Sequence, residues 1–162
     1  MLPCLTNDVA LLYYNAFIRS RFSYCTVFWF NNLHTCKQRL IDKINALISV
    51  LAVRRNLSFD EFVTTFHVFD VSKVYQVQSV SLLYDVTKSR NDYLSIQFVY
   101  NNDVHSHFTR GSTNIHIGPV TTCDSRNFIY NGIINWNACP AHLKLLPKRQ
   151  FVYQYKRWLF SV

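Results

Sequence analysis

Hydrophobic positions recur at helical spacing through the first half of the chain. Between residues 40 and 51 they follow one another by one, three or four positions, which marks one face of an α-helix. Valine stands at every third position from Val71 to Val80, whereas a strand would show alternation at every second position. The segment after Thr6 is apolar nearly all round, so we expect a helix that is covered on more than one side. The aromatic and β-branched segment 22–30 fits both a strand and a buried helix, and we assign it to helix.

Capping residues mark the helix boundaries. The segments 35–38 and 58–61 both have the form of a capping box, in which a hydroxyl accepts from the amide three residues later and the last side chain reaches back. The two arginines at 54–55 suit the negative end of a helix dipole and predict a helix end there. Either Asp70 or Ser72 begins the next helix.

The helical period fades between Tyr93 and Asn127, where Gly, Asn and Pro residues mark turns. Ile115 and Ile117 alternate with polar residues, which predicts one short strand or an extended arm. Helical spacing returns from Lys148 to Phe160. The sequence therefore predicts a mainly α fold: a helical bundle of about five or six helices, with an extended, partly irregular connection before a basic C-terminal helix.

The C-terminal helix has two kinds of surface when its residues are placed at about 100° each. One side holds Phe151, Val152, Tyr155, Trp158 and Leu159. A neighbouring side holds Lys148, Arg149, Tyr153, Lys156 and Arg157. We expect the apolar side to dock on the helical half of the chain and the basic strip, with its one tyrosine, to face outward.

Charge gives this strip a possible role. The 162-residue chain has a formal net charge of +8 and a pI near 9.4, and no acidic residue follows Asp124. This excess of positive charge favours an anionic partner. The three candidates are nucleic acid, an acidic membrane surface and an acidic protein. The alternative is a charged helix face that is merely solvated. The candidate nucleic-acid contacts are Arg110, Arg126, Lys144, Lys148, Arg149, Tyr153, Lys156 and Arg157, with the tyrosine placed to stack on a base or sugar.

Cysteine usage and hydropathy bear on the compartment. The five cysteines are an odd number and the first residues do not resemble a secretory signal, so we expect free thiols in a reducing intracellular setting, nucleus or cytoplasm. Asn15, Arg19 and Arg21 interrupt the first apolar run before it approaches the roughly 18 residues of a membrane-spanning helix. We therefore expect no membrane insertion.

Two reactive-site interpretations are weaker. Cys139 and His142 have the spacing of a zinc half-site, but no second tight Cys/His pair follows and cysteine is an ordinary small buried residue. The residues available to complete such a site are His105, His107, His116 and Cys123. Cysteine–histidine catalysis lacks any sign of a third group or an oxyanion site. We expect neither a metal nor a cofactor.

Three aromatic residues precede the C-terminal helix: Phe128, Tyr130 and Trp136. They would suit a base-stacking platform. The favoured interpretation is that Trp136 anchors the C-terminal segment to the helices, because large aromatic side chains usually supply the main buried area of a small domain.

The ordered residues resemble a known family. Residues 11–25, a leucine–tyrosine–aliphatic run ending in Ser-Tyr-Cys, with Trp29 shortly after, are similar to the helix pair that follows the palm of non-LTR (LINE-like) retrotransposon reverse transcriptases. The similarity continues in the same order through Thr109-Arg110, Ile115-His116-Ile117, Pro119-Val120, Phe128, Tyr130, Gly132, Trp136-Asn137, Pro140 and a closing Phe-x3-Tyr-Lys-Arg-Trp-Leu helix. Ile133, residues 120–122 and Cys139 stand where the family usually has proline, an arginine-rich segment and leucine.

The resemblance implies a thumb-like helical region, 1–92, and a post-thumb segment, 93–162, expected to pack as one unit. The polymerase reaction needs carboxylates that hold two metal ions, and these include an adjacent Asp-Asp pair. This chain contains no adjacent Asp-Asp pair. It is therefore expected to be no enzyme, with fingers and palm lying upstream and with RNA or an RNA–DNA hybrid as partner. The alternatives are a helical interaction module that packs on a missing palm, and a transposon relic without selected activity.

Overall fold

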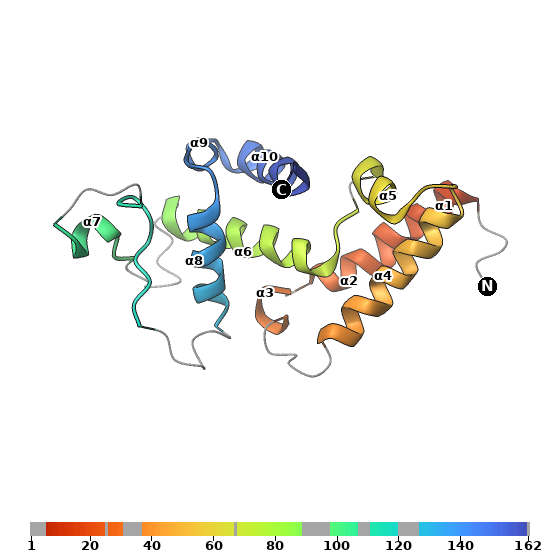
Figure 1. Ribbon diagram of the computed structural model, residues 1–162, viewed down its shortest axis with the longest axis horizontal. Helices are drawn as coiled ribbons and strands as arrows, with labels where there is room; N and C mark the ends of the chain where they lie inside the picture. Colours follow the sequence, from red (N-terminus) through yellow and green to blue (C-terminus); the bar gives the residue numbers. More distant parts are fainter. Residues whose placement is uncertain are drawn as a thin grey trace. The chain divides into compact units, whose positions relative to one another are not determined.

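The computed structural model describes residues 6–24, 26–30, 37–66, 68–88, 98–106, 111–119 and 127–161, and these residues are mainly helical, as predicted (Figure 1). The chain forms two compact units, Met1–Tyr75 and Gln76–Val162, and the boundary lies inside a helix, α6 (Val71–Lys88). The division into a thumb-like and a post-thumb region stays a prediction. Within the described ranges, no helix combines the length and hydrophobicity that crossing a membrane requires.

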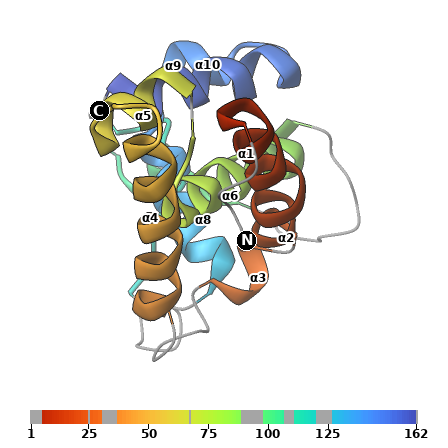
Figure 2. The same ribbon diagram turned by 90° about the vertical axis from the view of Figure 1, so that its right-hand side faces the viewer.

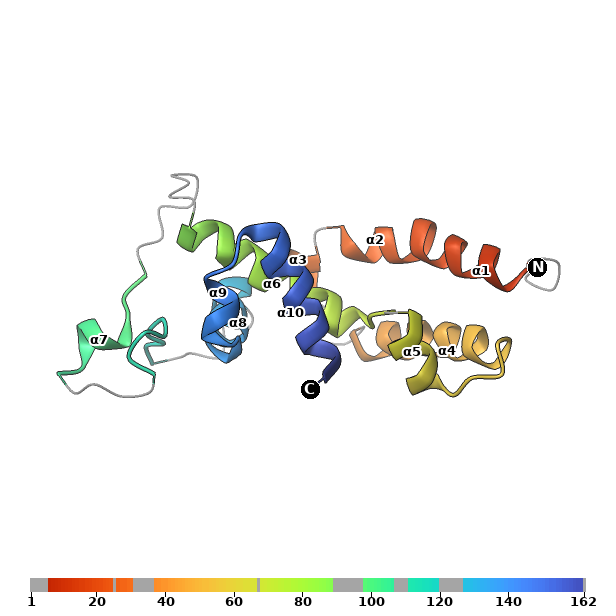
Figure 3. The ribbon, with the colours of Figure 1, turned by 90° about the horizontal axis from the view of Figure 1, so that it is seen from above.

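The first unit begins with a helical rod that runs without a break through α1 (Asn7–Tyr13), the π-helix η1 (Tyr14–Arg19) and α2 (Ser20–Ser23) (Figure 3). The elements α3 (Thr26–Trp29), α4 (Lys37–Val53) and α5 (Phe59–Phe66) follow. α4 lies beside the rod (Figure 2).

The core of the first unit lies between the rod, α4 and α5. Ala10 and Tyr14 of the rod are buried together with Ile44 and Ile48 of α4 and Phe62 of α5. The same cluster contains Phe30, Leu51, Ala52, Val68, Val71 and Tyr75. Burial raises the pKa of the Tyr14 hydroxyl to about 12. The helical stripe read between residues 40 and 51 is therefore the side of α4 that forms the core.

The other side of the rod is not covered as expected. Val9, Leu12, Tyr13 and Phe17 are 45%, 69%, 48% and 56% exposed. Their spacing of three or four residues places them on one stripe, and the rings of Tyr13 and Phe17 touch at a centroid distance of 4.8 Å. The expectation that this helix is covered on more than one side was wrong, and we call these four residues the exposed apolar stripe.

The segment 22–30 is helical at both ends, but the helix is interrupted. Tyr24 has an extended backbone (φ −67°, ψ 120°), so the rod ends there and α3 starts at Thr26. Phe30 then stacks on Tyr75 at 4.8 Å between ring centroids. The aromatic residues of this segment did not reveal the break at Tyr24, and the core contact of Phe30 is made with a residue far away in the sequence.

The predicted caps can be checked at two helices. The Ser58 hydroxyl accepts from the Glu61 amide at 3.3 Å and the Glu61 carboxylate accepts from the Ser58 amide at 2.9 Å, which confirms the second capping box. The hydrogen bonds from Ser58 lower the pKa of Glu61. Asp70 is the cap of α6, since its carboxylate accepts from the Lys73 amide at 2.7 Å. The capping box at 35–38 lies partly outside the described residues.

α4 ends where the arginine pair predicts, at Val53. Asn56 then adopts a left-handed backbone with φ of 54°, which asparagine tolerates better than most residues. The Arg55 guanidinium lies 4.3 Å from the Phe66 ring and 2.5 Å from the Asp8 carboxylate. Arg55 therefore joins the end of α4 to α5 and to the start of the rod, in addition to any effect on the helix dipole.

The second unit contains the rest of α6, with α7 (Asn101–Val104), α8 (Phe128–Ala138), α9 (Ala141–Lys144) and α10 (Lys148–Ser161). α8 approaches α6 closely at Gly132, where an added Cβ would lie 3.0 Å from the Leu83 Cδ2 atom. One turn further along α8, the Asn135 amide donates to the hydroxyl of the buried Ser79 at 3.1 Å. The close approach at Gly132 and the hydrogen bond to the buried Ser79 thus hold α8 against α6.

The expected short strand is present only as an antiparallel bridge between Tyr100 and Ile115, and no named strand occurs in the described ranges. The side chain of Asn137, on α8, forms the two backbone hydrogen bonds with Ile115 that a neighbouring strand would form. Its side-chain oxygen accepts from the Ile115 N–H at 3.0 Å, and its side-chain nitrogen donates to the Ile115 carbonyl at 2.8 Å. This pair of bonds fastens the backbone at Ile115 to α8.

Candidate nucleic-acid interface

α10 is held in place by the aromatic side chains on its buried side. Phe151, Tyr155 and Leu159 are buried, as the sequence predicts for the apolar side. The Phe151 ring stacks on Tyr84 of α6 at 4.8 Å and lies 5.8 Å from the Trp136 ring of α8. The Tyr84 hydroxyl donates to the Leu146 carbonyl at 2.7 Å, just before α10 begins. These contacts fix which side of α10 faces the solvent.

Four residues of the predicted basic strip lie on the opposite side of α10: Arg149, Tyr153, Lys156 and Arg157. Arg149, Tyr153 and Arg157 are exposed, and Lys156 is half-buried. They are spaced by three or four residues, so they form one stripe, which we call the basic stripe. The Arg157 guanidinium lies 5.9 Å from the centre of the Tyr153 ring, within the range of a cation–π contact.

Lys148 does not belong to this stripe. Its ammonium forms an ion pair with the carboxylate of Asp85, on α6. Lys148 precedes Tyr155 by seven residues, which is about two helical turns, so it lies above the buried side of α10. The sequence prediction that grouped it with the outward basic residues missed this ion pair; the Lys148 side chain is still 50% exposed, and its part in the interface stays a prediction.

Lys144 is also held by the protein. Its ammonium lies 5.3 Å from the centre of the Trp136 ring, and the side chain is half-buried at the end of α9. Burial lowers the pKa of this ammonium. Lys144 therefore covers the Trp136 ring, and its part in phosphate binding stays a prediction. Arg110 and Arg126 lie outside the described residues, and their part in the interface stays a prediction.

Trp136 serves as an anchor and not as a stacking platform. It is 5% exposed and packs against Tyr84 at 6.3 Å and Phe151 at 5.8 Å between ring centres. Phe128 and Tyr130 lie on the first turn of α8 and are half-buried. The preferred interpretation of Trp136 from the sequence is confirmed.

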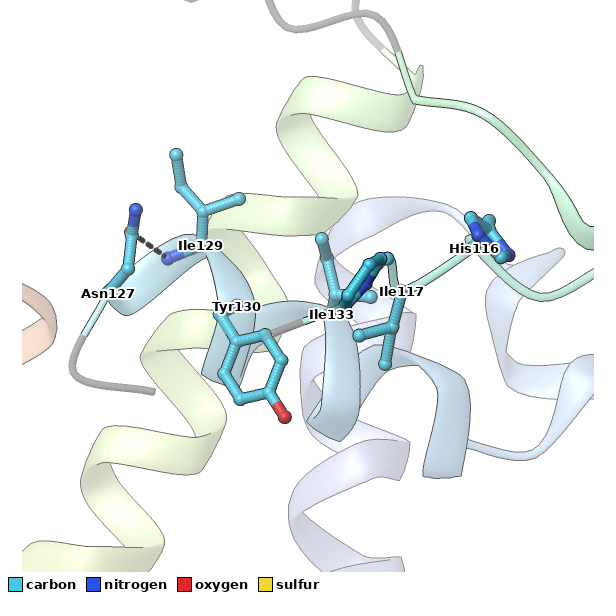
Figure 4. A pocket seen from close by; sticks show the side chains of 8 residues that line it. His116, Ile117, Asn127, Ile129, Tyr130 and Ile133 are labelled. Carbon is cyan, nitrogen blue, oxygen red and sulfur yellow. Dashed lines mark hydrogen bonds between the residues drawn. The ribbon is translucent and has the colours of Figure 1, made fainter. Parts of the chain in front are cut away.

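A small pocket opens beside the first turns of α8, between Asn127, Tyr130 and Ile133 and the extended residues His116 to Pro119 (Figure 4). Its volume is about 230 Å³, below the range of about 300–1,000 Å³ that is usual for drug-sized ligands. The Asn127 oxygen is already used, since it accepts from the Ile129 amide at 2.9 Å as the cap of α8. The pocket is therefore smaller than a usual ligand site, and one of its polar atoms is already engaged.

The candidate zinc ligands are not gathered into one site in the described part of the chain, where no group of three His, Cys, Asp or Glu residues has metal-binding geometry. His105 and His116 are neighbours, with ring centres 5.8 Å apart, and the His116 Nδ1 atom faces the Asn101 side-chain oxygen at 3.1 Å. Cys139 is buried, and burial raises the pKa of its thiol to about 11. His107 and Cys123 lie outside the described residues.

The structure shows two structural contacts that the sequence did not predict. One is the Asn137 clamp on Ile115, and the other is the ion pair that Asp85 makes with Lys148. Asp85 is the one acidic residue in the sequence of α6, so the sequence could have indicated that Asp85 has a cationic partner. Nothing local identified Lys148 as that partner, because the two residues are 63 positions apart.

Comparison of the chain with protein-family models, curated proteins and solved structures gives no significant match. The resemblance to non-LTR reverse transcriptases therefore rests on the ordered residues quoted from the sequence.

Proposed function

We propose that this chain is the non-catalytic C-terminal portion of a non-LTR retrotransposon reverse transcriptase and that it holds RNA or an RNA–DNA hybrid through the basic stripe of α10. The observation that carries the binding proposal is the outward position of Arg149 and Arg157 on a helix whose sequence contains no acidic residue. Cationic side chains on one helix face neutralise phosphates and release their counterions. The ordered resemblance supplies the class of nucleic-acid partner.

The test is a fluorescence-anisotropy titration of a labelled RNA and an RNA–DNA hybrid at several salt concentrations. Wild-type affinity is expected to fall steeply with salt, because each phosphate contact contributes about 0.7–0.9 to the slope of log K against log salt. Arg149→Gln/Arg157→Gln should reduce that slope by about 1.4–1.8. A salt-independent affinity, or a slope unchanged by the double substitution, would reject the proposal.

A matched control is available on α4. Arg39 and Lys43 are exposed on one helix, as Arg149 and Arg157 are, and lie four residues apart where the arginines lie eight apart. Arg39→Gln/Lys43→Gln removes the same net charge from the first unit. If both double variants weaken binding equally, only the overall charge matters and the assignment to α10 fails.

The exposed apolar stripe favours a second function, an interaction module that packs on a polymerase palm. Leu12 is 69% exposed and Phe17 is 56% exposed, and contiguous exposed apolar surface often marks a contact site. Here Leu12→Gln/Phe17→Gln should abolish binding to a separately expressed fingers–palm domain of this polymerase class, while Arg149→Gln/Arg157→Gln should not. Absence of both nucleic-acid and palm binding would leave the relic interpretation.

A further inference from the structure

Tyr153 is the exposed aromatic residue of the basic stripe. Its side chain is 59% exposed, whereas Phe151 and Tyr155 on either side of it are turned into the core. Arg149 lies one turn before it and Arg157 one turn after it, and the Arg157 guanidinium is 5.9 Å from its ring centre. An aromatic ring bordered by two cations in this way offers both a stacking surface and charges for a phosphate backbone.

We propose that the basic stripe selects single-stranded nucleic acid, with one unpaired base stacked on Tyr153 and the backbone running along the exposed Arg149 and Arg157. This inference rests on the proposed function and specifies its ligand. Proteins that bind single strands combine a positively charged track with aromatic rings on which bases stack. A duplex keeps its base faces stacked inside, so it would use the charges and gain little from the ring.

The dimensions of the stripe fit a short strand. Eight residues separate Arg149 from Arg157, which at 1.5 Å per residue is about 12 Å. Phosphates in a stacked strand rise by about 3.4 Å each, so this length corresponds to roughly three or four phosphates. The two exposed arginines and the single ring between them therefore fit a strand of about three phosphates with one base stacked.

A membrane surface is a poorer partner for the same helix. A helix that lies in a membrane interface inserts a broad apolar face beside its basic residues. The apolar face of α10 is already used, because Phe151, Tyr155 and Leu159 are buried against the rest of the second unit. Tyr153 alone remains as a large exposed hydrophobic side chain on the stripe.

The test measures binding of the full chain to a labelled single-stranded RNA and to the same RNA annealed to its complement. Tyr153→Leu should weaken single-strand binding about five-fold or more, as the loss of one stacked base predicts, and should leave duplex binding within about two-fold. Tyr153→Phe should retain both affinities, because the stacking ring is kept. Tyr24→Leu is the matched control, since Tyr24 is 78% exposed in the first unit and should have no effect.

The outcomes separate the two proposals. If Arg149→Gln/Arg157→Gln weakens binding but Tyr153→Leu changes neither affinity, or changes both equally, the proposed function stands and single-strand selection is overturned. If the wild-type chain binds no nucleic acid, both the proposed function and the single-strand inference are rejected. Tighter binding to anionic phospholipid vesicles than to the single strand also overturns the inference. Circular dichroism melts of each variant establish that the fold is retained, as expected for a substitution at an exposed position.

Discussion

Asn137 binds both backbone polar groups of Ile115, through one bond of 3.0 Å to its N–H and one of 2.8 Å to its carbonyl. A single amide side chain thus satisfies a buried residue in the way that a neighbouring strand would, since Ile115 is 1% exposed. The extended segment around Ile115 depends on this contact for its attachment to α8.

Replacing Asn137 should therefore destabilise the second unit. Asn137→Ala leaves the N–H and carbonyl of Ile115 without these partners and should lower the free energy of unfolding by about 1–3 kcal/mol. Asn137→Asp keeps an acceptor but loses the donor, so it should also be destabilising. Urea unfolding measures the change, and hydrogen exchange of the Ile115 amide locates it. Asn102→Ala, at an exposed asparagine, should be nearly neutral; equal effects at the two sites would contradict the clamp.

Gly132→Ala should destabilise the crossing of α6 and α8. The new Cβ would meet the Leu83 Cδ2 atom at 3.0 Å and its Cγ atom at 3.3 Å, and Leu83 is buried, so it has little room to move. The cost of overpacking is about 1–3 kcal/mol, and the higher helix propensity of alanine offsets up to about 1 kcal/mol.

A double-mutant cycle checks this prediction. Leu83→Val removes the crowded methyl position, so Gly132→Ala should cost less in the Leu83→Val background than in the wild type. Thermal and urea unfolding of the four proteins give the coupling free energy. A Gly132→Ala protein as stable as the wild type would show that Leu83 can move aside.

The parts of the fold that could be predicted are those set by neighbours in the sequence. The Ser58–Glu61 box forms because both partners lie within one turn, and the core side of α4 follows from its own spacing. The break at Tyr24 and the one-sided burial of the rod depend on which distant surfaces are present to cover apolar residues. The spacing of hydrophobic residues within one segment does not show which distant surfaces will cover it.

The same distinction holds for the interface. Arg149, Tyr153 and Arg157 could be placed on the outside of α10 because helical angles fix their relation to Phe151 and Tyr155. The positions of Lys144 over Trp136 and Lys148 beside Asp85 follow from contacts between helices. Charge counting assigned these two lysines to a partner without revealing these contacts, and their part in binding stays a prediction.

Stability should decline at alkaline pH, in part through Cys139. Burial raises the pKa of its thiol from 9.0 to about 11, so the unfolded chain loses this proton more readily than the folded one. The stability contributed by the protonated Cys139 thiol is fully present below pH 9 and is lost as the pH rises towards 11. The free energy of unfolding falls by at most about 3 kcal/mol through this group. Buried Tyr14, with its pKa raised to about 12, adds a further loss above pH 10.

The measurement is urea unfolding under reducing conditions between pH 8 and about 10.5, where the tyrosine contribution is still incomplete. Cys139→Ala removes the thiol, so the free energy of unfolding of this variant should fall less over this range than that of the wild type. Parallel curves for the two proteins would show that the Cys139 thiol does not differ between the folded and unfolded states.

The Asp85–Lys148 pair should limit how much Lys148 contributes to nucleic-acid binding. Lys148 is balanced by a neighbouring carboxylate, whereas Arg149 points outward on the basic stripe. Arg149→Gln should therefore reduce the salt slope of binding by about 0.7–0.9, and Lys148→Gln by clearly less. Asp85→Asn releases the charge of Lys148 and should strengthen binding and steepen its salt dependence. Anisotropy titrations of the three variants at matched salt test this order; a Lys148→Gln effect as large as that of Arg149→Gln would place Lys148 in the interface after all.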